Sequence, residues 1–208
     1  MLRKWDVGIF MFDEVEVLDF AGPFEVFSVT AYSQEGTVEE KPFSVKTVSE
    51  TGQMVTARNG LKVQPDYSFA TAPPFDILII PGGPGARQRE IYNENAIRWI
   101  QSRMPEVQFM TSVCTGALLL AKAGILDGKA ATTHWASYDR LEQEFPQVTV
   151  KQNVKFVDEG NIVTSGGISA GIYMSFHLVA KLLGWETAMN TAKRMEFDLD
   201  RSHFPANG

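Results

Sequence analysis

The sequence predicts an α/β fold in which a mostly parallel central sheet is covered by helices on both faces. Apolar segments with strand character alternate with helical segments along the chain, an arrangement typical of parallel sheets. The segment 76–80 (DILII) is apolar without interruption, as central strands buried on both faces are. Because the sequence shows no internal repeat and no linker, we interpret residues 1–208 as a single domain.

In the first half of the chain, the expected elements are short strands around one helix. Residues 5–12 are apolar and β-rich, which predicts a buried first strand. A helix is expected to begin at the Gly-Pro pair at 22–23, because proline suits the first turn of a helix. Residues 43–48 alternate and predict a second strand. Residues 53–65 predict a short β segment with a turn at their Asn-Gly pair.

In the second half, most expected helices end at a glycine or just before a proline, residues that stop helices. The expected helices are 93–103, 115–123, 136–145, 169–183 and about 186–198. The expected strands are 107–113, 129–133, 148–157 and 161–165, the last two forming a β pair. The tail, residues 201–208, is expected to be frayed.

Composition narrows the classes of partner and the location. The net charge of −6 and the pI of about 5.1 argue against nucleic acid and anionic membranes, because both favour clustered lysine and arginine. The short apolar run at the N-terminus does not resemble a signal peptide, and no apolar run approaches the ~20 residues that span a bilayer. A single cysteine excludes an intramolecular disulfide and fits a reducing compartment. We therefore expect a cytoplasmic protein.

The single cysteine, Cys114, is the candidate reactive centre. The expected strand 107–113 passes into the expected helix 115–123 with almost no loop, which forces Cys114 into a strained turn like a nucleophile elbow. Gly116 removes a side chain that would crowd this turn. The helix N-terminus is expected to favour a reactive thiolate. The alternative for a lone cysteine is an inert, buried residue, and the elbow favours the functional interpretation.

A glycine-rich segment, 81–85, follows the apolar strand 76–80 and is the second candidate part of the site. Glycines allow a close approach of backbone amides to a ligand, so Gly82 and Gly83 are expected to form an oxyanion hole. The segment would open at the same sheet edge as Cys114. A plain tight turn is one alternative. A phosphate loop is disfavoured, because the sequence has neither a Lys-Ser/Thr pair nor a GxGxxG pattern here.

Asp19 and His134 are the remaining candidates. Asp19 lies among apolar residues, which would raise its pKa and suit a general acid or base, with a helix N-cap as the alternative. His134 could act as a base for Cys114 or as a hydrogen-bonded structural residue, and we favour a supporting role behind the reactive centre. His177 is expected in the core and His203 in the tail. These histidines and the single cysteine have no metal-binding spacing.

Four segments resemble the DJ-1/PfpI superfamily, within the class I glutamine amidotransferase-like fold. In chain order they are LDFAGPFEVF, DILIIPGGPGA, TSVCTGALLLAKAGILDGKAATTHW and IVTSGGISAG. They are most similar to the isonitrile (isocyanide) hydratase branch. The resemblance implies a flavodoxin-like sandwich with a nucleophile elbow, a homodimer, a small-molecule substrate, and no metal or organic cofactor.

The same resemblance assigns roles to individual residues. Cys114 would be the nucleophile and Asp19 the acid and base, Gly82 and Gly83 would supply backbone amides, and Thr115 would flank the nucleophile. The implied reaction is the hydration of an isonitrile to an N-substituted formamide through a thioimidate, a lyase activity. Thr115 stands where the family's proteases carry histidine, which argues against a peptidase.

Two other functions stay open from the sequence. The chain also resembles the ligand-sensing N-terminal halves of AraC-type transcription regulators, which would make it a stand-alone sensing module. The second open function is a DJ-1-like role, in which Cys114 is oxidised to a sulfinic acid or acts on reactive carbonyls.

Overall fold

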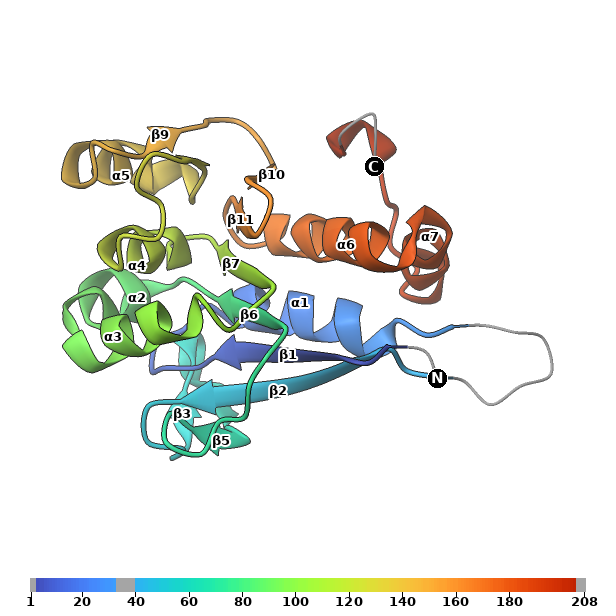
Figure 1. Cartoon of the computed structure of the whole chain (residues 1–208), viewed down its shortest axis with the longest axis horizontal. Helices are drawn as coiled ribbons and strands as arrows, with labels where there is room; N and C mark the ends of the chain where they lie inside the picture. Colours follow the sequence, from blue (N-terminus) through green and yellow to red (C-terminus); the bar gives the residue numbers. More distant parts are fainter. Residues whose placement is uncertain (1–2, 33–39, 205–208) are drawn as a thin grey trace.

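The computed structural model describes residues 3–32 and 40–204, and a seven-stranded sheet lies at its centre (Figure 1). The strand order is β10-β11-β7-β6-β1-β2-β5. The strands are β1 (Trp5–Phe10), β2 (Phe43–Ser49), β5 (Tyr67–Ser68), β6 (Ile77–Ile80), β7 (Phe109–Val113), β10 (Phe156–Asp158) and β11 (Ile162–Ser165). Every neighbouring pair is parallel except β10 with β11, so the predicted fold class is confirmed.

Two groups of helices flank this sheet. The first group is α1 (Val17–Val29), α6 (Ala170–Leu183) and α7 (Trp185–Arg194), which pack on one another. The second group is α2 (Pro84–Gln88), α3 (Glu94–Arg103) and α4 (Gly116–Lys122). None of the helices within the described residues is long and apolar enough to cross a membrane.

Smaller elements complete the fold outside the main sheet. They are α5 (Tyr138–Glu144), the parallel pair of β8 (Ala130–Ala131) and β9 (Thr149–Val150), and the antiparallel pair of β3 (Val55–Thr56) and β4 (Lys62–Val63). Between β3 and β4 the chain turns at Asn59, whose φ is 63°, as the Asn-Gly pair predicts.

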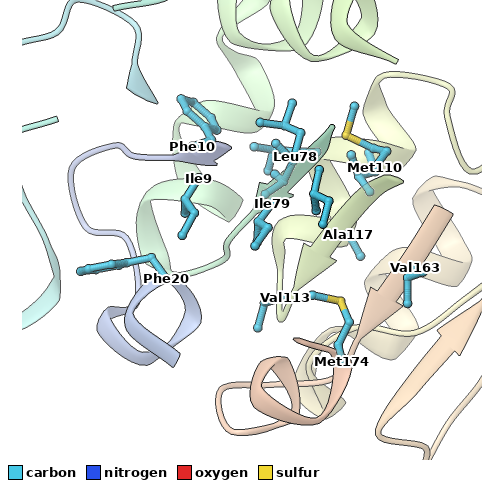
Figure 2. Packing of buried hydrophobic residues seen from close by; sticks show 14 of the residues in the cluster. Ile9, Phe10, Phe20, Leu78, Ile79, Met110, Val113, Ala117, Val163 and Met174 are labelled. Carbon is cyan, nitrogen blue, oxygen red and sulfur yellow. The ribbon is translucent and has the colours of Figure 1, made fainter. Parts of the chain in front are cut away.

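The core lies on both faces of the sheet because successive side chains of a strand point in opposite directions. The ring of Phe10 in β1 lies 6.0 Å from the ring of Trp99 in α3, measured between centroids. Its neighbour Ile9 lies on the side of Phe20 in α1 (Figure 2). Burial on both faces fits the uninterrupted apolar sequence of β6 at the centre of the sheet.

The first helix begins earlier than its proline predicts. α1 begins at Val17, and Pro23 lies inside it. Proline cannot donate a hydrogen bond to the carbonyl four residues before it, which belongs to Asp19. Close packing of α1 on α6 offsets that loss, since a Cβ added at Gly22 would lie 2.9 Å from Ile172. The earlier start places Asp19 in the first helical turn.

The expected strand 148–157 is divided in the structure, and this prediction was wrong. Its first part is β9, which pairs with β8, and its last part is β10, which pairs with β11. The polar stretch between them includes Asn153 with a φ of 59°, which breaks the extended backbone. The antiparallel pairing of β10 with β11 agrees with the predicted β pair.

Three further differences from the predictions concern α2, the end of α7 and the tail. The sequence analysis did not predict α2, which begins at Pro84. α7 ends at Arg194 rather than near residue 198, and Glu196 then takes a φ of 50°. Phe204 packs edge-on against Trp185 with ring centroids 5.0 Å apart, so the described part of the tail is anchored. Residues 205–208 lie outside the described residues.

Candidate active site

Cys114 occupies a tight turn between β7 and α4, as the sequence predicts. Its φ of 56° is a left-handed value that residues other than glycine adopt rarely. Its N–H donates to the carbonyl oxygens of Ser165 and Gly166 at 3.2 and 3.0 Å, which ties the turn to the end of β11. A Cβ added at Gly116 would collide with the carbonyl oxygen of Ile80, so glycine is required there.

The Cys114 side chain borders a cavity although it is mostly buried. Only 6% of the residue is exposed, yet it lines a cavity of about 350 Å³. The other walls include Glu16 before α1, Arg87 in α2, His134, and Ile168 after β11. The cavity therefore lies where several strands and loops end at one edge of the sheet, the usual position for ligands in α/β folds.

The Asp19 carboxyl group meets the thiol from α1. Asp19 is fully buried, and its Oδ2 accepts a hydrogen bond from the Gly82 N–H at 2.9 Å. Its Oδ1 accepts no hydrogen bond from the described residues, and the Cys114 thiol is close enough for each of the two groups to affect the pKa of the other. Burial raises the pKa of Asp19 to about 8 from an ordinary value of 3.8, although the Gly82 N–H opposes the rise. At neutral pH this carboxyl is mostly protonated.

The thiol itself is not the ready thiolate that the sequence analysis expects. Burial raises the pKa of Cys114, and the nearby charge of Asp19 raises it further. The N–H groups of Thr115 and Ile168 lower this pKa, as does the Thr115 hydroxyl, but burial outweighs them. Cys114 therefore needs a proton acceptor when it attacks, and Asp19 can accept that proton only in its ionised form, whose share grows as pH rises toward about 8.

Ile168 is a site residue that the sequence analysis missed. Its backbone has a φ of 52° and directs its N–H toward the Cys114 sulfur. The Gly166-Gly167 pair just before it could have indicated an unusual backbone here, but the analysis used that pair only as a helix start. The apolar side chain of Ile168 carries no sign of the role of its backbone.

Gly82 and Gly83 lie at the site, but the N–H groups of both donate to side chains of the protein. The Gly82 N–H donates to Asp19, and the Gly83 N–H donates to the Thr115 hydroxyl at 2.9 Å. A Cβ added at Gly82 would lie 2.5 Å from the Thr115 nitrogen, so the glycine allows this approach. The expectation that these amides form an oxyanion hole is therefore revised: they position Asp19 and Thr115.

His134 lies at the cavity wall without a hydrogen bond to the sulfur among the described residues. Its Nδ1 accepts from the Ala136 N–H at 3.2 Å, and its ring packs against Gly167, where an added Cβ would collide with it. Burial lowers the pKa of His134, and the positive charge of Arg87 lowers it further. The ring of His134 thus packs against the loop that carries Ile168, and its supporting role stays a prediction.

The other two histidines take no part in this cavity. His177 is buried in α6 and pairs with Asp158 at 2.6 Å, and His203 packs edge-on against Tyr173. Within residues 3–32 and 40–204, no three histidine, cysteine, aspartate or glutamate side chains gather as metal ligands do.

This fold and site define a class of α/β proteins built around one cysteine on a strand-to-helix elbow. The family within that class follows from a family model, described as DJ-1/PfpI family, that matches residues 6–181. The chain belongs to the DJ-1/PfpI family.

Two relatives show how far this similarity extends. The chain is 35% identical over 191 residues to the isonitrile hydratase of Pseudomonas putida, covering 92% of this chain and 78% of that protein. It is 33% identical over 140 residues to the HTH-type transcriptional regulator GbdR of Pseudomonas aeruginosa, covering 67% of this chain but 37% of the regulator.

Solved structures agree with the fold. A THiJ/PfpI family protein from Pseudomonas syringae has a TM-score of 0.84 at 25% identity, with 100% of this chain and 80% of that chain covered. DJ-1beta of Drosophila melanogaster has a TM-score of 0.79 at 18% identity, with 96% of this chain and 100% of that chain covered, which supports the fold alone.

The substitution Asp19→Asn tests whether burial holds this carboxyl protonated. A raised pKa in the folded state contributes stability below the unfolded pKa, and that stability is lost as pH rises toward about 8. Asparagine does not ionise and keeps an oxygen for the Gly82 N–H. From about pH 5 to about pH 8, we expect the free energy of unfolding of the wild type to fall relative to Asp19→Asn by at least ~1.4 kcal/mol, the equivalent of one pKa unit.

Urea denaturation at several pH values measures this difference. Asp139→Asn, which changes an exposed carboxyl in the first turn of α5, is the control and should follow the wild type. Parallel pH dependence of the wild type and Asp19→Asn would contradict the raised pKa.

Proposed function

We propose that this protein catalyses the hydration of isonitriles to N-substituted formamides, with Cys114 as the nucleophile and Asp19 as the acid and base. One observation carries this proposal: a buried thiol and a buried carboxyl with a pKa raised to about 8 interact with each other beside a cavity. The similarity to the Pseudomonas putida isonitrile hydratase over 92% of the chain supports it.

The chemistry of the isonitrile carbon requires this pair of groups. That carbon must gain both a bond to a nucleophile and a proton. In its ionised form, Asp19 accepts the S–H proton as the sulfur bonds to the terminal carbon of R–N≡C, and it then delivers this proton to that carbon and becomes a carboxylate again. The product is the thioimidate R–N=CH–S–Cys114. General acid–base transfer of this kind typically accelerates a step by about 10²–10⁴-fold.

Hydrolysis of the thioimidate completes the cycle. As water adds its oxygen to the same carbon, the Asp19 carboxylate accepts one water proton and passes it to the nitrogen, which gives R–NH–CH(OH)–S–Cys114. The C–S bond then breaks as the carbonyl forms, and the hydroxyl proton passes through Asp19 to the sulfur. The overall change adds one water to R–N≡C and releases R–NH–CHO, so the thiol and the carboxyl return to their starting states.

Neighbouring donors stabilise the charges that develop in these steps. The N–H groups of Thr115 and Ile168 lower the pKa of Cys114, so they favour negative charge on the sulfur during attack and release. The Gly82 N–H holds Oδ2 of Asp19, which leaves Oδ1 for the proton.

A ligand-sensing domain is the second candidate function. The similarity to GbdR, a transcriptional regulator, over 67% of this chain favours it. A sensor would bind its ligand in this cavity without turnover, so the two candidates differ in whether product forms.

Conversion of p-nitrophenyl isocyanide to the formamide, followed by chromatography, tests the proposed reaction. We expect the wild type to form product and both Cys114→Ala and Asp19→Asn to lose at least about 10²-fold in rate, the scale of lost nucleophilic or acid–base catalysis. Asp139→Asn is the control and should retain the wild-type rate. Equal rates for the wild type and Cys114→Ala would reject the mechanism, and binding without product would favour the sensor.

The pH dependence of kcat/KM tests the role of Asp19 separately. Only the ionised carboxyl can accept the S–H proton, and the pKa of Asp19 is about 8. We expect kcat/KM to rise with pH through about 8, and the residual activity of Asp19→Asn to lack this rise. A wild-type profile that is flat between about pH 6 and about pH 9 would contradict proton transfer to Asp19.

We also propose that the protein is a homodimer in the cytoplasm, without a nucleic-acid or membrane partner. The family resemblance motivates the dimer, and the net charge of −6 and the single cysteine motivate the rest. Light scattering on the purified protein should give twice the chain mass of 23.1 kDa. A mass equal to that of one chain would contradict the dimer.

A further inference from the structure

The wall of the Cys114 cavity carries an excess of positive charge. Three arginines line it, Arg58, Arg87 and Arg140. Glu16 is the one acidic residue among the lining residues that the structure describes. A charged group in a cavity wall either has a partner in the protein or is available to a ligand, so the partners of the three arginines decide what this cavity accepts.

Two of these arginines have protein partners. Nη1 of Arg58 lies 2.6 Å from the Glu16 carboxylate. Arg140 pairs with Glu144 at 2.8 Å, and its guanidinium also donates to the carbonyl oxygen of Arg87 and to the Tyr92 hydroxyl. Both side chains are therefore held in place, and their charges are balanced by carboxylates.

The Arg87 guanidinium differs from the other two. It forms no hydrogen bond or ion pair with any residue in the described part of the chain. It is half-buried, so it has lost part of its hydration. Its charge acts on His134, whose pKa is lowered by burial first and by Arg87 second. His134 is thus neutral near neutral pH, and Arg87 leaves one unbalanced positive charge at the cavity.

We propose that Arg87 binds a carboxylate of the substrate, and that the substrates are isonitriles that carry one carboxylate. This inference rests on the proposed function. A guanidinium binds a carboxylate through two parallel hydrogen bonds, and such charge-assisted bonds are strong. One unbalanced cation matches a monoanion better than a dianion such as a phosphate ester. The cavity of about 350 Å³ suits a small molecule.

Alkylation of Cys114 tests the carboxylate site without reference to turnover. Cys114 is the only cysteine, so alkylation followed by mass spectrometry measures its reaction alone. Iodoacetate carries a carboxylate, whereas iodoacetamide is its neutral counterpart. We expect the ratio of the iodoacetate rate to the iodoacetamide rate to fall about tenfold in Arg87→Met at low salt, the scale of one lost charge-assisted bond. The ratio cancels any change in thiol ionisation.

Two further variants sharpen this test. Arg87→Lys keeps the positive charge and should restore part of the ratio. Arg98→Met removes an exposed arginine of α3 that lines a different cavity and pairs with Glu94, and it should leave the ratio at the wild-type value. An unchanged ratio in Arg87→Met would overturn the carboxylate site.

Turnover of isocyanoacetate and of its neutral methyl ester tests the substrate class. We expect kcat/KM for the acid to exceed that for the ester, and the acid-to-ester ratio to fall at least about tenfold in Arg87→Met but not in Arg98→Met. Turnover of the ester without preference for the acid would overturn this inference and leave the hydratase proposal intact. Turnover of neither compound would contradict the proposed function, and the alkylation ratio would still decide the carboxylate site.

Discussion

The contact between the Asp19 carboxyl and the Cys114 thiol is the constraint on which the rest of the site depends. Burial raises the pKa of both groups, so neither ionises readily, and the thiol can react only by passing its proton to the ionised form of Asp19. The surrounding donors act on this pair from two sides. The Gly82 N–H holds one carboxyl oxygen, and the N–H groups of Thr115 and Ile168 face the sulfur. The chemistry available to the cavity is therefore proton transfer coupled to attack by sulfur.

The parallel sheet brings these distant parts of the chain to one edge. β6 leads into the glycine loop, β7 leads into Cys114, and β11 leads into the loop that carries Ile168. The loop after β6 and the turn after β7 approach each other closely only because glycines lack side chains. A Cβ at Gly82 would meet Thr115, and a Cβ at Gly116 would meet Ile80. Glycines in these loops thus act by allowing contact between backbones, and the ligand-facing donors come from elsewhere.

The fold class, the elbow and the candidate pair were predictable because each leaves a local pattern: apolar strands, a cysteine between a strand and a helix, and an acid among apolar residues. Other features depend on packing. Pro23 lies inside α1, and the helix packs closely on α6 at Gly22 and Ile172, a contact between segments far apart in the chain. The pKa of the Cys114 thiol depends on how deeply it is buried, and that burial comes from several segments of the chain. Ile168 contributes a backbone N–H, so its side chain gives no signal.

The residues in and beside the cavity wall divide into those whose substitution disturbs the reactive pair and those whose substitution does not. Gly82, Gly116 and Gly167 allow no added carbon atom without a collision. Arg87 projects from the short helix α2, and its guanidinium bonds to none of the described residues. Arg87 can therefore be replaced during evolution while the thiol and the carboxyl stay in place. Such an arrangement lets members of one lineage diverge in which molecules they accept and still inherit the same reaction centre.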